Sequence, residues 1–139
     1  MKPHILFVTC LTFLGCATSQ RSIPHVAAEE AAWFKVPATL PDTGRQTIPG
    51  VVATAIQLAM DDFLPRDLGT PKDAGPQALC LAQRQSYDVE AAPGPEGVVW
   101  VSIHPSPGAC RQSGPLLDTG SATYAVDVQQ WRILAVQHP

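Results

Sequence analysis

Two aspartates in this sequence each begin the tripeptide Asp-Thr-Gly, at Asp118-Thr119-Gly120 and at Asp42-Thr43-Gly44. Two carboxyl groups that share one proton can activate a water molecule for hydrolysis, because like charges at short distance do not both ionise. His104, which precedes Pro105, is a further candidate acid, base or ligand. One interpretation of the sequence is therefore a small hydrolase that uses Asp118 or His104.

The stretch Leu116–Ala122 (LLDTGSA) resembles the active-site loop of aspartic proteases. In that family, each such loop is followed by a flap hairpin and by a later apolar strand that ends in glycine. Only 19 residues follow Gly120, and Pro41 replaces the apolar residue expected before Asp42. The tripeptide is also typical of tight turns, in which Asp accepts backbone hydrogen bonds and Gly takes a positive φ. We therefore assign no catalytic residue and favour a non-enzymatic protein over the hydrolase.

Other chemistry-bearing patterns are missing from the sequence. There is no P-loop, dinucleotide-binding fingerprint or calcium loop, and His4, His25 and His138 stand far from His104 along the chain. We therefore expect neither a cofactor nor a metal site. Lys and Arg number 9 against 12 Asp and Glu, which gives a formal net charge of -3. This balance argues against a nucleic-acid partner, because a phosphate backbone requires a clustered basic surface.

The N-terminus has the pattern of an export signal. Lys2 precedes the uncharged apolar run Ile5–Leu14, which is typical of the central region of a secretory signal peptide. The run is too short to cross a bilayer as a helix, which takes roughly 20 apolar residues. The run ends in Phe13-Leu14-Gly15-Cys16, which resembles the lipobox of bacterial lipoproteins. In that family, the peptide before the cysteine is removed and the thiol receives a diacylglyceryl group.

This resemblance implies that residues 1–15 are a signal peptide and that Cys16 is the lipidation site. The protein would then be anchored by lipid on the periplasmic side of the cell envelope, with the membrane as a partner. In enterobacterial lipoproteins, Asp after the cysteine retains the protein on the inner membrane. Ala17 stands there, which favours the outer membrane. The alternative is an ordinary secretory signal that is cleaved near Ala17-Thr18-Ser19.

The signal peptide and the lipidation site would account for two of the four cysteines. Cys10 leaves with the signal peptide and Cys16 carries lipid, so Cys80 and Cys110 remain as a pair in an oxidising compartment. This pairing predicts a disulfide bond. A redox pair or a metal site is the alternative, but the spacing is not Cys-x-x-Cys and no histidines cluster with these cysteines.

Periodicity predicts the elements that must position these residues. Apolar residues recur at helical spacing over residues 48–64, with Thr47 as the expected cap and Pro65 as the end. A two-residue alternation predicts four strands, at 86–92, 97–104, 122–128 and 131–137. We expect an α+β fold, in which one main helix packs on a four-stranded antiparallel meander. The second strand places Trp100 and His104 on its outward face, as a candidate contact surface.

The chain divides, by this interpretation, into the signal peptide at 1–15, the lipidated cysteine with a tether or arm at 16–46, and a single domain at 47–139. Residues 25–35 form either a short helix or an extended, docked arm. The helix-then-meander order resembles the cystatin-like and NTF2-like α+β folds, whose late strand pair is echoed by Tyr124–Asp127 and Arg132–Leu134. This resemblance bears on the fold and not on activity.

No catalytic cluster stands out beside these features. We therefore expect a membrane-anchored envelope lipoprotein that acts as a non-enzymatic binding module for an envelope protein or peptide. The alternatives are the small periplasmic hydrolase described above and a structural spacer of the envelope.

Overall fold

The computed structural model describes residues 23–66, 69, 72–110 and 120–139. The chain divides into two units, residues 1–43 and 44–139. The described part of the first unit contains one turn of helix, α1 (Ala28–Ala31), within an extended stretch. Trp33 and Phe34 follow it and are 89% and 77% exposed. Residues 25–35 therefore form an exposed arm with a single helical turn, which no side-chain hydrogen bond caps.

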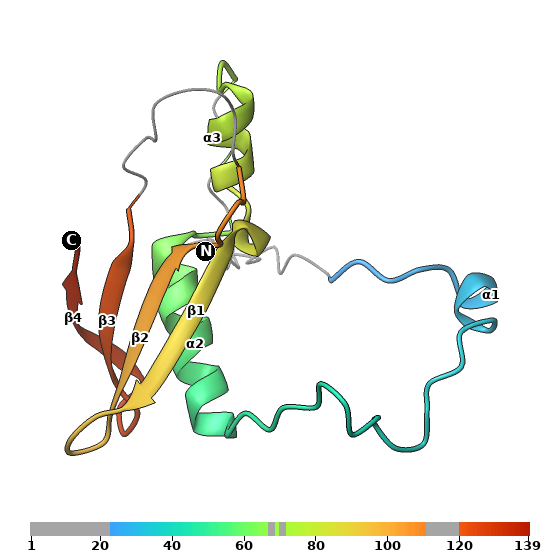
Figure 1. Cartoon of the computed structure of the whole chain (residues 1–139), viewed down its shortest axis with the longest axis horizontal. Coiled ribbons are helices and arrows are strands. Elements are labelled where there is room, and N and C mark those ends of the chain that lie inside the picture. The colour runs from blue at the N-terminus through green and yellow to red at the C-terminus, as the bar shows by residue number, and fades with distance from the viewer. Residues whose placement is uncertain (1–22, 67–68, 70–71, 111–119) are drawn as a thin grey trace, which may run out of the picture. The chain divides into compact units, whose positions relative to one another are not determined.

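The second unit contains one long helix and a sheet (Figure 1). The long helix is α2 (Gly50–Phe63), and two short helical segments follow it, α3 (Pro76–Leu81) and η1 (Arg84–Ser86). Four antiparallel strands pair in the order β1-β2-β3-β4. Their bounds are Tyr87–Pro93, Val98–Pro105, Ala122–Asp127 and Arg132–Gln137. The α+β fold predicted from the sequence is confirmed, with each predicted strand within one residue of its observed bounds.

The start of α2 differs from the expectation. Pro49, and not Thr47, occupies the N-cap position, and no side-chain hydrogen bond caps the helix. The dihedral angles of Pro49 (φ -55°, ψ 138°) hold the chain extended until Gly50, so Thr47 lies too early to reach the first turn. The end of α2 is as predicted, because Leu64 leaves the helical conformation directly before Pro65.

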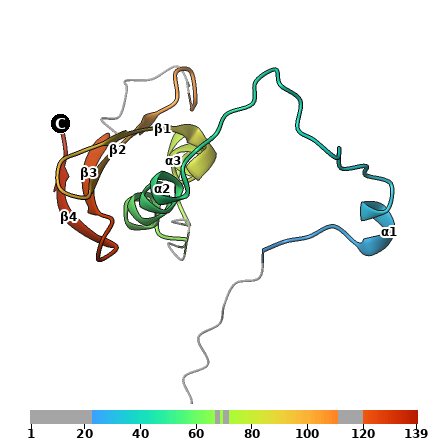
Figure 2. The same cartoon turned by 90° about the horizontal axis from the view of Figure 1, so that it is seen from below.

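The core lies between α2 and the inner face of the sheet, which curves around the helix (Figure 2). On α2, Ala55 and Ala59 are fully buried against the sheet. Their small side chains let the helix lie close to the strands. The sheet contributes buried side chains from its two central strands: Val99, Val101, Ile103, Ala122, Tyr124 and Val126. At the β1 side, the rings of Phe63 and Tyr87 pack edge to face, with their centroids 5.0 Å apart.

The strand register fixes which side chains lie on the other face of the sheet. Val101 pairs with Tyr124 on the inner face, while Trp100 pairs with Ala125 one residue earlier. Because successive side chains alternate between faces, Trp100 and His104 lie together on the outer face, which α2 does not cover. The sheet therefore holds the two predicted contact residues on one strand, on the face away from the core.

Candidate functional site

The outer face of the sheet is centred on Trp100, whose side chain is flanked by small residues. Ala92 on β1 and Ala125 on β3 pair with Trp100, and Ala135 on β4 pairs with Ala125. Trp100 is 42% exposed, whereas Ala125 beside it is 5% exposed. The result is one large aromatic side chain in a row of alanines that spans all four strands.

Gly94, in the turn after β1, is what allows Trp100 to lie as it does. A Cβ atom at Gly94 would lie 2.6 Å from the indole Nε1, closer than side-chain atoms approach one another. The indole therefore packs directly on the glycine backbone. This contact fixes the ring against the hairpin turn, so that Trp100 is held in place although its side chain is partly exposed.

A polar row runs beside the alanine row on the same face. Glu90, Ser102, Thr123 and Gln137 pair in sequence across the four strands. The Thr123 hydroxyl lies 3.4 Å from the Ser102 hydroxyl. We define the outer patch as Trp100 with these four residues and His104. It offers hydroxyl, amide, imidazole and carboxylate groups, which can donate and accept hydrogen bonds around an aromatic centre.

His104 has a carboxylate neighbour on this face. Its Nε2 lies 3.9 Å from Oε1 of Glu90, whose side chain is 78% exposed. A catalytic histidine needs a nucleophile or a water-binding cavity within hydrogen-bond reach. Among the described residues, no hydrogen bond connects His104 to a serine, threonine or cysteine.

The two Asp-Thr-Gly tripeptides are only partly described. Asp118 and Cys16 lie outside the described residues, so their surroundings are not part of this structure. Gly44 and Gly120 both have positive φ, at 76° and 44°. This conformation agrees with the tight turns that the tripeptide predicts. In the described part of the chain, no three His, Cys, Asp or Glu side chains gather closely enough to hold a metal ion.

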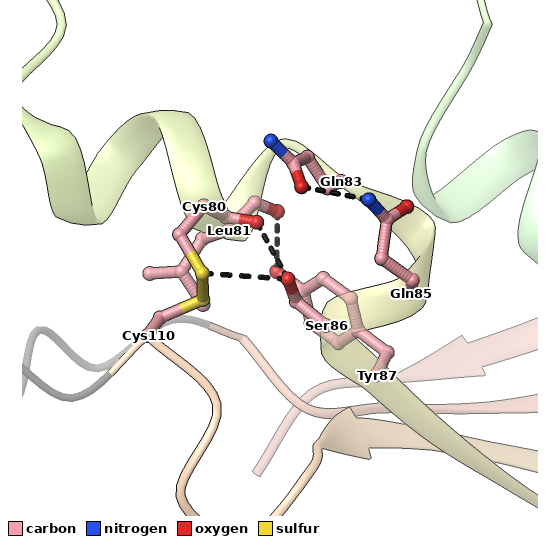
Figure 3. Close-up of a disulfide and its surroundings, with 7 residues drawn as sticks. All are labelled: Cys80, Leu81, Gln83, Gln85, Ser86, Tyr87 and Cys110. Atoms are coloured by element: carbon pink, nitrogen blue, oxygen red, sulfur yellow. Dashed lines mark hydrogen bonds between the residues drawn. A yellow bond between two sulfur atoms is a disulfide. The ribbon is translucent and has the colours of Figure 1, made fainter.

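The predicted disulfide is present between Cys80 and Cys110, whose Cα atoms lie 5.5 Å apart. Figure 3 shows how polar contacts support it. The buried Ser86 hydroxyl donates a 2.7 Å hydrogen bond to the Cys80 carbonyl, and the Tyr87 hydroxyl donates one of 2.9 Å to the Leu81 carbonyl. These bonds join α3 to η1 and to the start of β1, and the disulfide joins α3 to the segment after β2.

Sequence patterns did not predict an ionic cluster at the end of α2. In this cluster, Nε of Arg66 lies 3.4 Å from Oδ1 of Asp61. Burial would raise the pKa of Asp61, but hydrogen bonds and charge from Arg84 and Arg66 outweigh it, so this pKa is lowered. Burial raises the pKa of the Tyr124 hydroxyl to about 12, and the neighbouring Asp62 carboxylate contributes to this rise.

The turn between β3 and β4 contains an exposed tryptophan in an unusual conformation. Trp131 has φ 52° and is 43% exposed. The left-handed region is favoured by glycine, and a bulky side chain there is an outlier. Asp127 holds the turn, because its carboxylate accepts hydrogen bonds from the backbone N–H groups of Gln129 and Gln130. Trp131 therefore lies partly exposed in the β3–β4 turn, and its left-handed backbone conformation destabilises the turn.

No helix within the described residues has the length and apolar composition needed to span a bilayer. The chain matches no family model, no curated protein and no solved structure.

Proposed function

We propose that this chain is a lipid-anchored protein of the bacterial cell envelope, whose domain is a non-enzymatic binding module for an envelope protein or peptide. The anchor is the diacylglyceryl group expected on Cys16, and the location is the periplasmic side, on the outer membrane. The lipobox-like Phe13–Cys16 supports the anchor. The Cys80–Cys110 disulfide is consistent with an oxidising compartment.

The observation that carries the binding role is the 42% exposure of Trp100 on a central strand, on the sheet face that α2 does not cover. Tryptophan is enriched among the residues that contribute most to protein–protein binding, because it buries a large surface with few rotatable bonds. A ring that was needed only for stability would be expected in the core. Trp100 instead lies across the sheet from the core and is held on the backbone of Gly94.

The rest of the outer patch matches the usual organisation of a protein interface. An apolar centre, Trp100 with its flanking alanines, is bordered on one side by the polar row of Glu90, Ser102, Thr123 and Gln137. In such interfaces, the buried centre supplies affinity and the polar rim supplies register and specificity. An extended peptide or a flat protein surface fits this shape.

The anchor is tested by Cys16→Ser in the full chain. Wild type should partition with membranes and gain the mass of the lipid, because two or more acyl chains give stable anchoring. The variant should lose both properties, whereas Cys10→Ser should keep both. Unchanged mass and membrane partitioning of Cys16→Ser contradict the lipid anchor.

The binding surface is tested by photo-crosslinking in cells. A benzophenone amino acid at Thr123, on the outer patch, should yield a discrete crosslinked product, and Trp100→Ala should abolish it. The same probe at Gln57, which is exposed on α2, should yield no such product. A product that persists in Trp100→Ala, or that forms equally from Gln57, contradicts a binding role for the outer patch.

A further inference from the structure

The sheet has two edge strands, β1 and β4, and their edges differ in composition. β1 carries Asp88 and Glu90, and it ends at Pro93, which has no backbone N–H to donate. Acidic side chains and proline are common devices that keep an exposed edge from pairing with another strand. The β1 edge is therefore protected against strand addition.

The β4 edge lacks most of these devices. Its sequence, Arg132-Ile-Leu-Ala-Val-Gln137, contains one charge and no proline. Leu134 is 50% exposed and Val136 is 38% exposed. A register shift opposite Ala125 and Val126 disturbs the strand at Leu134, but Ala135, Val136 and Gln137 continue in regular pairing with β3. Within the described residues, β3 is the only strand that pairs with β4.

We propose that β4 pairs antiparallel with β4 of a second copy of this chain, which joins the two sheets across a two-fold axis. The charge pattern of the strand suits this partner. Antiparallel pairing centred on Ala135 places the two Arg132 side chains at opposite ends of the interface, about 20 Å apart for six residues at ~3.4 Å each. This distance exceeds the Debye length of about 8 Å at physiological salt. The apolar residues Leu134 to Val136 then meet near the axis.

Other strand pairings are less favourable for this chain. Two β1 edges would bring four carboxylates together, from Asp88 and Glu90 of each copy. A β1–β4 pairing would meet Pro93 and would leave a free edge at each end, so that it would extend into a filament. Pairing of β4 with β4 uses each such edge once and closes as a dimer. The interface is a short ladder, so we expect weak association, with a Kd on the order of micromolar.

The experiment compares two alanines of the outer face that lie on opposite edges. The full chain carries Cys10→Ser and Cys16→Ser, which leaves Cys80 and Cys110 in their disulfide, and then either Ala135→Cys on β4 or Ala92→Cys on β1. A short bismaleimide should crosslink Ala135→Cys into dimers and leave Ala92→Cys monomeric. Equal crosslinking of both variants, none with Ala135→Cys, or products larger than dimers overturn the proposal.

Sedimentation equilibrium of the same chain without the added cysteine gives a second readout. Leu134→Lys should weaken the dimer at least tenfold, because the two new charges lie close together, diagonally across the axis. Ala92→Lys on β1 is the matched control and should leave the mass distribution unchanged. Circular dichroism checks folding, and Ala135→Glu replaces Leu134→Lys if the latter unfolds. A dimer that persists in a folded β4 variant, or a monomer at every concentration, overturns the proposal. Trp100→Ala should leave the dimer intact, so this result is separate from the test of the outer patch.

Discussion

The guanidinium of Arg84 lies 2.6 Å from the carboxylate of Asp61 and connects the last turn of α2 to the start of the sheet. The same nitrogen of Arg84 donates a 2.7 Å hydrogen bond to the carbonyl of Leu64, which follows α2. One side chain thus satisfies both a carboxylate and a free carbonyl at the helix C-terminus. The position of α2 over the sheet depends in part on this contact.

Arg84→Ala should destabilise the domain by about 1 kcal/mol, because it removes two charge-assisted hydrogen bonds from a partly exposed site. The measurement is urea unfolding followed by circular dichroism. Arg132→Ala is the matched control, since Arg132 pairs with Asp127 at 3.3 Å but is 60% exposed. Arg132→Ala should lower the free energy of unfolding by less than Arg84→Ala does. Equal losses in the two variants would show that Arg84 acts only as a surface charge.

Stability should fall in acid because the pKa of Asp61 is lowered in the folded protein. Burial acts to raise this pKa, and the hydrogen bonds and charges of Arg84 and Arg66 outweigh it. The stabilisation is present above the unfolded value near 3.8 and is lost as pH falls through the folded pKa. Urea midpoints measured between neutral pH and pH ~3 should decrease below about pH 4. The decrease should be shallower in Arg84→Ala, and an identical profile contradicts this assignment.

Tyr124 should resist ionisation far into the alkaline range. Burial raises its pKa to about 12, and Asp62 adds to the effect by its charge and as acceptor of the hydroxyl hydrogen bond. Since the folded pKa lies above the unfolded value of 10.0, this stabilisation is complete below pH ~10 and is lost as pH rises toward about 12. The pKa of Tyr124 is measured by titration of the ultraviolet absorbance of the phenolate. Asp62→Asn should lower the pKa, and Tyr124→Phe should remove the late transition.

Loss of the disulfide should cost about 3.5 kcal/mol, from the entropy of a loop closed over a sequence separation of 30 residues. The comparison is urea unfolding of wild type and of the double variant Cys80→Ser with Cys110→Ser. Dithiothreitol should shift the wild-type midpoint to that of the double variant and leave the double variant unchanged. Free-thiol labelling of Cys80 and Cys110 in denatured, unreduced wild type would contradict the bond.

Trp131→Gly should be more stable than Trp131→Ala by about 1 kcal/mol. Both substitutions remove the indole, but only glycine relieves the left-handed backbone at this position, where φ is 52°. Thermal unfolding of the two variants measures the difference without a contribution from lost ring contacts. Equal stability would mean that the turn rearranges when the side chain is removed.

Periodicity was sufficient to predict the helix and the strands. Apolar residues at helical spacing located α2, and alternation located β2 with Trp100 and His104 on its outer face. The Cys80–Cys110 bond followed from counting the thiols that would remain after the export predicted from the N-terminus. Each of these features depends on local pattern or composition, which a single sequence contains.

Contacts between distant residues could not be predicted in this way. Arg84 and Asp61 are separated by 23 positions, and no spacing rule links them. The N-cap of α2 is Pro49 and not the predicted Thr47, because the backbone path before the helix decides which residue occupies that position. The left-handed conformation of Trp131 depends on the turn around it, which residue spacing does not predict. The lipidation of Cys16 and a role for Asp118 stay predictions, since both residues lie outside the described part of the chain.

The meander order of the sheet also bears on when the disulfide can form. Each strand pairs with its neighbour along the chain, and such local contacts form quickly because little chain must be immobilised first. Pairing of Tyr87 with Pro105 at the open end of the β1–β2 hairpin brings the flanking Cys80 and Cys110 toward each other. Oxidation of the two thiols therefore requires this hairpin and does not require β3 and β4. An early covalent bond would then hold half of the sheet while the rest of the chain assembles on it.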